Sequence, residues 1–120
     1  MRSILLSILI LLISNTCIYA SDLWLTTAYC SCFRCCNKSD GIMASGRKVY
    51  PGAVACNWLP FGTRLKVGNR IYTVEDRGAK SLFGTKDNHI KHLDIYMPTH
   101  KEALRYGRRW VDVEILRQGR

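Results

Sequence analysis

The chain has 120 residues, enough for one compact domain and no more. Its 18 lysine and arginine residues stand against 9 aspartate and glutamate residues, a formal net charge of +9. An excess of this size favours an anionic partner. The basic residues are spread along the chain in short clusters, so solubility alone is an alternative reason for the charge.

Residues 1–20 have the pattern of a secretory signal peptide. Arg2 supplies a positive start, residues 4–13 form an apolar run, and Ala20 ends a small-residue exit. We expect cleavage before Ser21 and no stable membrane span afterwards. The apolar run itself is shorter than the roughly 20 residues that a membrane anchor needs. An uncleaved anchor is the alternative. Export predicts a secreted or periplasmic, cell-wall-associated protein, and it argues against nucleic acid as the anionic partner. Anionic cell-wall polymers and the carboxylates of peptidoglycan fit better.

Five cysteines remain in residues 21–120. In an oxidising compartment, two disulfides among them would stabilise a small domain. Because five is odd, at least one thiol stays free, pairs between chains or binds a ligand. Zinc held by four thiolates is the alternative, but a cluster this tight makes four-fold convergence difficult, so we predict disulfides and no metal. The His89-x-x-His92 pair is too weak a signal for a metal site. The disulfide candidates are Cys30, Cys32, Cys35, Cys36 and Cys56.

The sequence pattern predicts a mainly β domain. Short apolar or alternating runs predict strands, and Gly68-Asn69 between two of them predicts a hairpin with a primed turn. Thr99 with Glu102 forms a capping box that predicts a single short helix before the last strand, ending at Gly107. We expect His100 to be a residue at the start of that helix without a functional role. Many short strands and one helix indicate an antiparallel or mixed β-barrel. The expected strands cover 24–29, 54–56, 64–67, 71–74 and 111–115.

Two aspartates are the strongest candidates for chemistry. Asp76 in Val-Glu-Asp-Arg-Gly and Asp94 in Leu-Asp-Ile-Tyr each close a short strand pattern. Glycoside cleavage needs a proton donor beside the bridging oxygen and a second polar group that orients it or steadies positive charge. The alternative is that both are turn residues, since Asp-Arg-Gly is an ordinary way to leave a strand.

An ordered series of motifs resembles the 3D domain, a family named for its three aspartates. The series runs through Thr-Ala-Tyr, Ala-Ser-Gly, Leu-Pro-Phe-Gly-Thr, Asp-Arg-Gly, Asp-Ile-Tyr and a His-x-x-Ala-Leu helix, over residues 25–116. That family is similar to the catalytic barrel of MltA-type lytic transglycosylases and, more loosely, to RlpA, barwin and expansin domains. The resemblance implies that residues 21–120 form a six-stranded double-psi β-barrel that cleaves peptidoglycan glycan strands without a cofactor.

The resemblance also assigns roles to the two aspartates. Asp94 would be the acid/base, with a pKa raised by its apolar neighbours so that it holds a proton near neutral pH. Asp76 would orient the sugar or tune Asp94 as a nearby like charge. The expected reaction attacks the bond between N-acetylmuramic acid and N-acetylglucosamine and leaves a 1,6-anhydromuramoyl end. Two alternatives stay open: a glycoside hydrolase that uses the same carboxylates, and a wall-binding barrel without turnover.

Other positions of the family pattern supply substrate-binding candidates. The family's first aspartate is replaced here by Asn57, which can hydrogen-bond but cannot titrate. The stretch from Gly78 to Leu93 is longer than in the family, so we expect it to form a loop at the rim of the groove. The substrate-binding candidates are Asn57, Tyr29, Thr27, Ser45 and Arg77.

Overall fold

The computed structural model describes residues 22–36 and 38–120. The expected signal peptide and its cleavage site lie outside these residues. In the part of the chain that is described, no helix combines the length and apolar character needed to cross a membrane.

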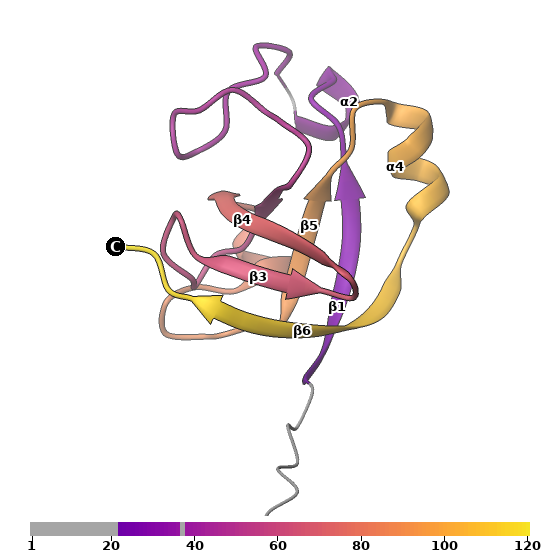
Figure 1. The fold of residues 1–120 in the computed structure, drawn as a ribbon. Coiled ribbons are helices and arrows are strands. Elements are labelled where there is room, and N and C mark those ends of the chain that lie inside the picture. Colours follow the sequence, from indigo (N-terminus) through magenta and orange to yellow (C-terminus); the bar gives the residue numbers. More distant parts are fainter. Residues whose placement is uncertain (1–21, 37) are drawn as a thin grey trace, which may run out of the picture.

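Six strands close into a barrel (Figure 1), in the order β1-β5-β2-β4-β3-β6. The pairs β1–β5 and β2–β4 are parallel and the other neighbours are antiparallel. The expectation of a six-stranded, mixed β-barrel is therefore confirmed. The strands are β1 (Asp22–Tyr29), β2 (Ala53–Ala55), β3 (Arg64–Val67), β4 (Arg70–Asp76), β5 (His92–Tyr96) and β6 (Arg109–Arg117).

Strand β3 shows how a strand turns one face to the core. In β3, Leu65 and Val67 are buried while Arg64 and Lys66, which alternate with them, are exposed. Gly68 then turns the chain into β4 with φ of 58°, a left-handed conformation that glycine adopts without steric cost. The core is filled by aliphatic side chains and by Trp24, whose ring stacks on Trp58 at 5.4 Å between centroids.

The expected helix is α4 (His100–Tyr106), and its start carries the predicted capping box. Thr99 accepts a hydrogen bond from the Glu102 backbone N–H, and the Glu102 side chain accepts one from the Thr99 backbone N–H. The helix is fixed to β1 through a 2.6 Å hydrogen bond between the hydroxyls of Tyr106 and Thr26. The expectation of a single helix is wrong, because α2 (Phe33–Cys36) and α3 (Lys80–Phe83) each add one turn. Four residues are too few to show a helical apolar period.

The disulfide prediction is also wrong for the described residues. All five cysteines among them are free thiols. Three of the sulfurs gather around the ring of His100, Cys36 instead donates a hydrogen bond to the Cys30 carbonyl at 3.1 Å, and Cys56 is buried in the core. Cys30, Cys32 and Cys35 therefore contact His100 and do not form disulfides with one another.

Candidate functional site

The two aspartates lie in one row across the barrel. Ala55 of β2 is the register partner of Asp76 on one side and of Asp94 on the other. Asp94 is in turn the partner of Thr27 in β1. Residues directly opposite each other on paired strands project from the same face of a sheet. Four neighbouring strands thus present Thr27, Asp94, Ala55 and Asp76 side by side.

A bulge between β2 and β4 brings Asp76 into that row. Val54 pairs with Val74, but the next pair is Ala55 with Asp76, so one residue of β4 is skipped. That residue, Glu75, points to the other side, where it accepts a hydrogen bond from Tyr50 at 3.0 Å. A bulge of this kind re-aims the side chains that follow it. Without it, Glu75 would face the row in place of Asp76.

Asp94 is the titratable group with the clearest sign of function. It is the third of five residues in β5, so the expectation that it closes its strand is wrong; the strand runs on to Tyr96. Burial raises the pKa of Asp94 to about 6, against a hydrogen bond from Thr27 that lowers it, and the charge of Asp76 raises it further. A carboxyl group with this pKa exchanges its proton close to neutral pH.

Asp76 is held by three hydrogen-bond donors. Its Oδ2 accepts from the Tyr29 hydroxyl at 2.9 Å, and its Oδ1 accepts from the backbone N–H groups of Ala44 and Arg77, both at 2.9 Å. Burial and the adjacent Asp76 raise the pKa of Tyr29, so its hydroxyl keeps its proton and remains a donor. The three contacts fix the carboxyl group in one orientation beside the groove.

A chain of hydrogen bonds leads from Asp94 to His92. The Thr27 hydroxyl lies 3.0 Å from Asp94 Oδ1 and 2.8 Å from His92 Nε2, and His92 Nδ1 lies 3.1 Å from the Leu82 carbonyl oxygen. A carbonyl only accepts, so Nδ1 carries the proton. Burial lowers the pKa of His92, so the ring is neutral and Nε2 is an acceptor.

This arrangement can satisfy the protonated form of Asp94 as well as the ionised form, although the Thr27 hydrogen bond by itself lowers the pKa of Asp94. The Thr27 hydroxyl has one hydrogen. When Asp94 is ionised, Thr27 donates to it and His92 Nε2 has no donor from Thr27. When Asp94 is protonated, it donates to Thr27, and Thr27 donates to His92. The protonated state therefore makes one more hydrogen bond than the ionised state.

The two carboxyl groups open into a groove of about 390 Å³. Its floor includes Ala55, whose small side chain leaves space between Asp94 and Asp76. One wall comes from the segment after β4, with Leu82 and Phe83 of α3. Of the stretch 78–93 that was expected to form a loop at the rim, only residues between 78 and 83 line the groove. The other wall comes from α2 and the residues after it, and it includes Lys38, Cys35 and Cys36.

Of the other candidates from the sequence, Tyr29, Thr27 and Arg77 lie at the site, and Ser45 does not. Tyr29 and Thr27 bind the two aspartates directly, and Arg77 lines the groove while its guanidinium lies 3.9 Å from the centroid of the Phe61 ring. Ser45 is outside the groove lining; its Oγ accepts a weak hydrogen bond from the Arg47 N–H at 3.4 Å, and its neighbour Ala44 supplies the donor to Asp76.

Asn57 lies behind the rim and holds it in place. Its Nδ2 donates to the carbonyls of Gly78 at 3.0 Å and Gly84 at 2.8 Å, and its Oδ1 accepts from the Gly78 N–H at 2.8 Å. An amide can make this combination of contacts, whereas a carboxylate could not donate to either carbonyl. The asparagine therefore has a local structural reason to stand here.

Sequence reasoning missed His92 and Ala55 as parts of the site. His92 lies two residues before Asp94, on the same face of β5, and this spacing was the available signal. Ala55 carries no functional group, and only the register of three strands reveals its position between the carboxyls.

Among the described residues, one group has the composition of a metal site: Cys30, Cys32, Cys35 and His100. A hydrogen bond from Cys30, followed by backbone hydrogen bonds from Cys35 and Arg34, lowers the pKa of the Cys32 thiol to about 6. The group lies beside the groove, since Cys35 also lines it.

No model of a known protein family matches the chain, and no curated protein does so either.

Proposed function

We propose that this chain is an exported lytic transglycosylase, which cleaves the bond between N-acetylmuramic acid and N-acetylglucosamine in peptidoglycan and leaves 1,6-anhydromuramoyl ends. The observation that carries the proposal is Asp94 in an open groove, with burial raising its pKa to about 6. Such a group can donate a proton and take it back within one reaction at near-neutral pH.

Asp94 acts in both steps of the reaction. As an acid, it protonates the bridging oxygen while the bond to the muramic anomeric carbon breaks. As a base, it then removes the proton from the 6-hydroxyl of the same sugar, whose oxygen forms the new bond to the anomeric carbon. One carboxyl group is enough because no water molecule has to be activated. The Thr27–His92 chain can accept the proton-bearing starting state, in which Asp94 donates to Thr27 and Thr27 donates to His92.

Asp76 assists from the other side of Ala55. It accepts hydrogen bonds from three fixed donors, so it is oriented before substrate arrives. As positive charge develops on the sugar ring, an oriented acceptor in the same groove stabilises it without having to reorganise. Lys38 and Arg77 at the groove supply positive charge that suits the stem carboxylates of peptidoglycan.

We also propose that the barrel has the double-psi topology of the 3D domain family. A closed barrel of six strands with two parallel pairs accords with a double-psi topology, and the motif series supports membership of the 3D domain family. On this reading residues 1–20 direct export, and the domain acts in the periplasm or outside the cell at the wall. Peptidoglycan glycan strands are its partner, with anionic wall polymers as secondary contacts.

Mass spectrometry of muropeptides released from purified sacculi tests the proposal. We expect wild-type residues 21–120 to release 1,6-anhydro products, Asp94→Asn to release none while still binding sacculi, and Asp87→Asn, at an exposed loop position, to match wild type. Reducing ends would identify a hydrolase. Binding without any products from wild type would identify a binding module, and normal cleavage by Asp94→Asn would remove Asp94 from the reaction.

A further inference from the structure

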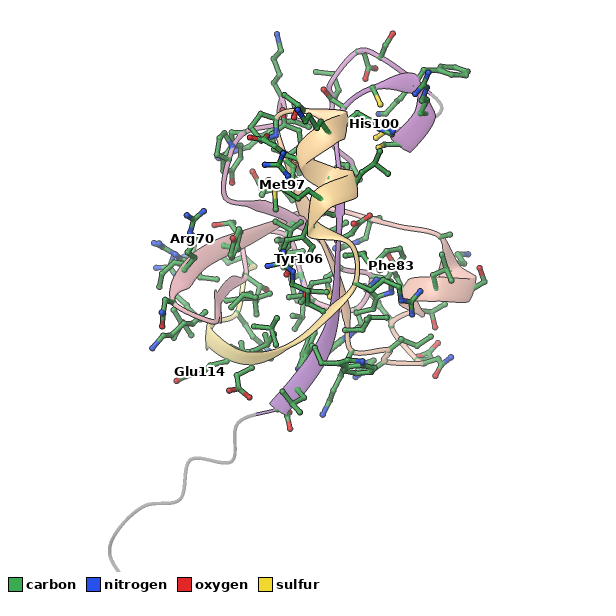
Figure 2. The ribbon with its side chains drawn as sticks, turned by 90° about the vertical axis from the view of Figure 1, so that its right-hand side faces the viewer. Arg70, Phe83, Met97, His100, Tyr106 and Glu114 are labelled. Atoms are coloured by element: carbon green, nitrogen blue, oxygen red, sulfur yellow. The ribbon has the colours of Figure 1, made fainter. Side chains whose placement is uncertain are left out.

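Four potential metal ligands converge beside the groove. The His100 Nδ1 atom lies 3.6 Å from the sulfur of Cys30, 3.4 Å from that of Cys32 and 3.5 Å from that of Cys35. The Cys30 sulfur lies 2.8 Å from that of Cys32 and 3.2 Å from that of Cys35. All four ligand atoms lie within 4.8 Å of one another. Figure 2 shows sulfur atoms beside His100 near the start of α4.

These separations are close to those of a tetrahedral zinc site. Zinc–sulfur bonds of about 2.3 Å and zinc–nitrogen bonds of about 2.0–2.1 Å place sulfur and nitrogen about 3.5 Å apart in a tetrahedron. The three nitrogen–sulfur distances match that value. The sulfurs would have to separate by up to about 1 Å to reach the spacing of thiolates around one ion. Small rotations of cysteine side chains about Cα–Cβ are sufficient for such a change.

The ligands come from three elements that the fold brings together. Cys30 follows the last residue of β1, Cys32 and Cys35 form a Cys-x-x-Cys turn around the start of α2, and His100 is the first residue of α4. The Thr99 capping box sets where α4 begins, and it thereby sets which residue faces the sulfurs. In Figure 1, α2 and the start of α4 lie near each other at the same end of the barrel.

We propose that Cys30, Cys32, Cys35 and His100 bind one Zn²⁺ ion in a closed tetrahedral site. Three thiolates and an imidazole are a donor set that suits zinc. The three thiols lose their protons to solvent when the ion binds, no electrons are exchanged, and the site carries a net charge of −1. Arg34 and Lys101, adjacent in sequence to the ligands, are suited to balance that charge.

The role of the ion is structural. All four coordination positions are filled by the protein, so no position remains for water or substrate. The ion ties β1, α2 and α4 together, and through Cys35 it holds one wall of the groove. It also accounts for the odd number of cysteines, since three bind the metal while Cys36 and Cys56 remain thiols.

Metal content is the direct test, and it is independent of any glycan cleavage. Reduced wild-type residues 21–120 are equilibrated with Zn²⁺, and bound zinc per chain is measured by inductively coupled plasma mass spectrometry after gel filtration. We expect one zinc ion per chain for wild type and for Cys36→Ser, the matched control one residue from a ligand. We expect Cys35→Ser and His100→Ala to bind zinc more than about 100-fold more weakly, since even changes behind a ligand cost 10–100-fold.

Substitution with Co²⁺ keeps the test valid where a variant fails to fold. The wild-type protein should show intense sulfur-to-cobalt charge-transfer bands and the strong visible bands of tetrahedral cobalt. The proposal is overturned if reduced wild type takes up neither ion, if its cobalt spectrum lacks the thiolate bands, or if Cys36→Ser loses zinc as fully as Cys35→Ser.

Discussion

Replacing Asp94 by asparagine should stabilise the folded protein at alkaline pH. Burial raises the pKa of this carboxyl from 3.8 to about 6, so folding disfavours its ionised form. A shift of about two pKa units corresponds to about 3 kcal/mol when the group is ionised in both folded and unfolded chains. Asparagine keeps the shape of the side chain and has no charge to desolvate. We therefore expect Asp94→Asn to raise the free energy of unfolding at pH 8 by up to about 3 kcal/mol.

The pH dependence identifies the cause. A carboxyl group that binds its proton more tightly in the folded chain adds stability as pH falls through the folded pKa of about 6 toward the unfolded value of 3.8. The advantage of Asp94→Asn should thus shrink to about 1.6 kcal/mol at pH 5 and about 0.6 kcal/mol at pH 4.

Chemical denaturation at the three pH values measures these differences. Asp87→Asn, at an exposed position, is the control and should change stability by less than about 0.5 kcal/mol throughout. The expected effect is contradicted if Asp94→Asn is no more stable than wild type at pH 8, or if its gain in free energy of unfolding does not fall on acidification. Either result would show that burial does not disfavour the ionised form of this carboxyl group.

Three further substitutions separate the roles of the residues around the carboxyls. His92→Phe keeps a ring against Phe83 but removes the acceptor for the Thr27 hydroxyl, so Thr27 is free to donate to ionised Asp94. The pKa of Asp94 should then fall by about one unit. In a pH–rate profile, the loss of cleavage activity at rising pH, expected near pH 6 for wild type, should move down by the same amount. Tyr29→Phe removes one donor from Asp76 and should lower the cleavage rate about tenfold while leaving that limb in place, measured in the same assay. Asn57→Asp loses two donors to backbone carbonyls and should destabilise the domain by about 2 kcal/mol in urea denaturation, whereas unchanged stability would remove its role at the rim.

Local patterns in the sequence were enough for the barrel and for part of the site. The alternation in β3, the Gly68 turn and the Thr99 capping box each depend on residues a few positions apart, and the structure has all three. The two aspartates that the strand patterns singled out, Asp76 and Asp94, line one groove in the structure.

The remaining features depend on contacts between distant residues. The bulge that selects Asp76 over Glu75 exists only in the pairing of β2 with β4. The proton on His92 Nδ1 is assigned by a carbonyl ten residues away at Leu82. His100 meets the cysteines across about 70 positions, so the spacing of the cysteines alone favoured disulfides and gave no sign that His100 lies among them.

The Asp94 carboxyl and the proposed metal site should both affect the free energy of unfolding, in opposite directions. A domain of about 100 residues has only about 5–15 kcal/mol of net stability, so a cost of about 3 kcal/mol at Asp94 is a large fraction of it. A bound ion that the unfolded chain binds less well adds stability by mass action.

Removing zinc with a chelator at pH 8 should then lower the melting temperature of both wild type and Asp94→Asn. Chelated Asp94→Asn should remain folded at temperatures where chelated wild type does not. At pH 4.5 the gap between the two chelated proteins should narrow, because Asp94 is protonated there. A chelator that leaves both melting temperatures unchanged would show that no metal contributes to the fold, while the difference between the two proteins at pH 8 would still report on Asp94 alone.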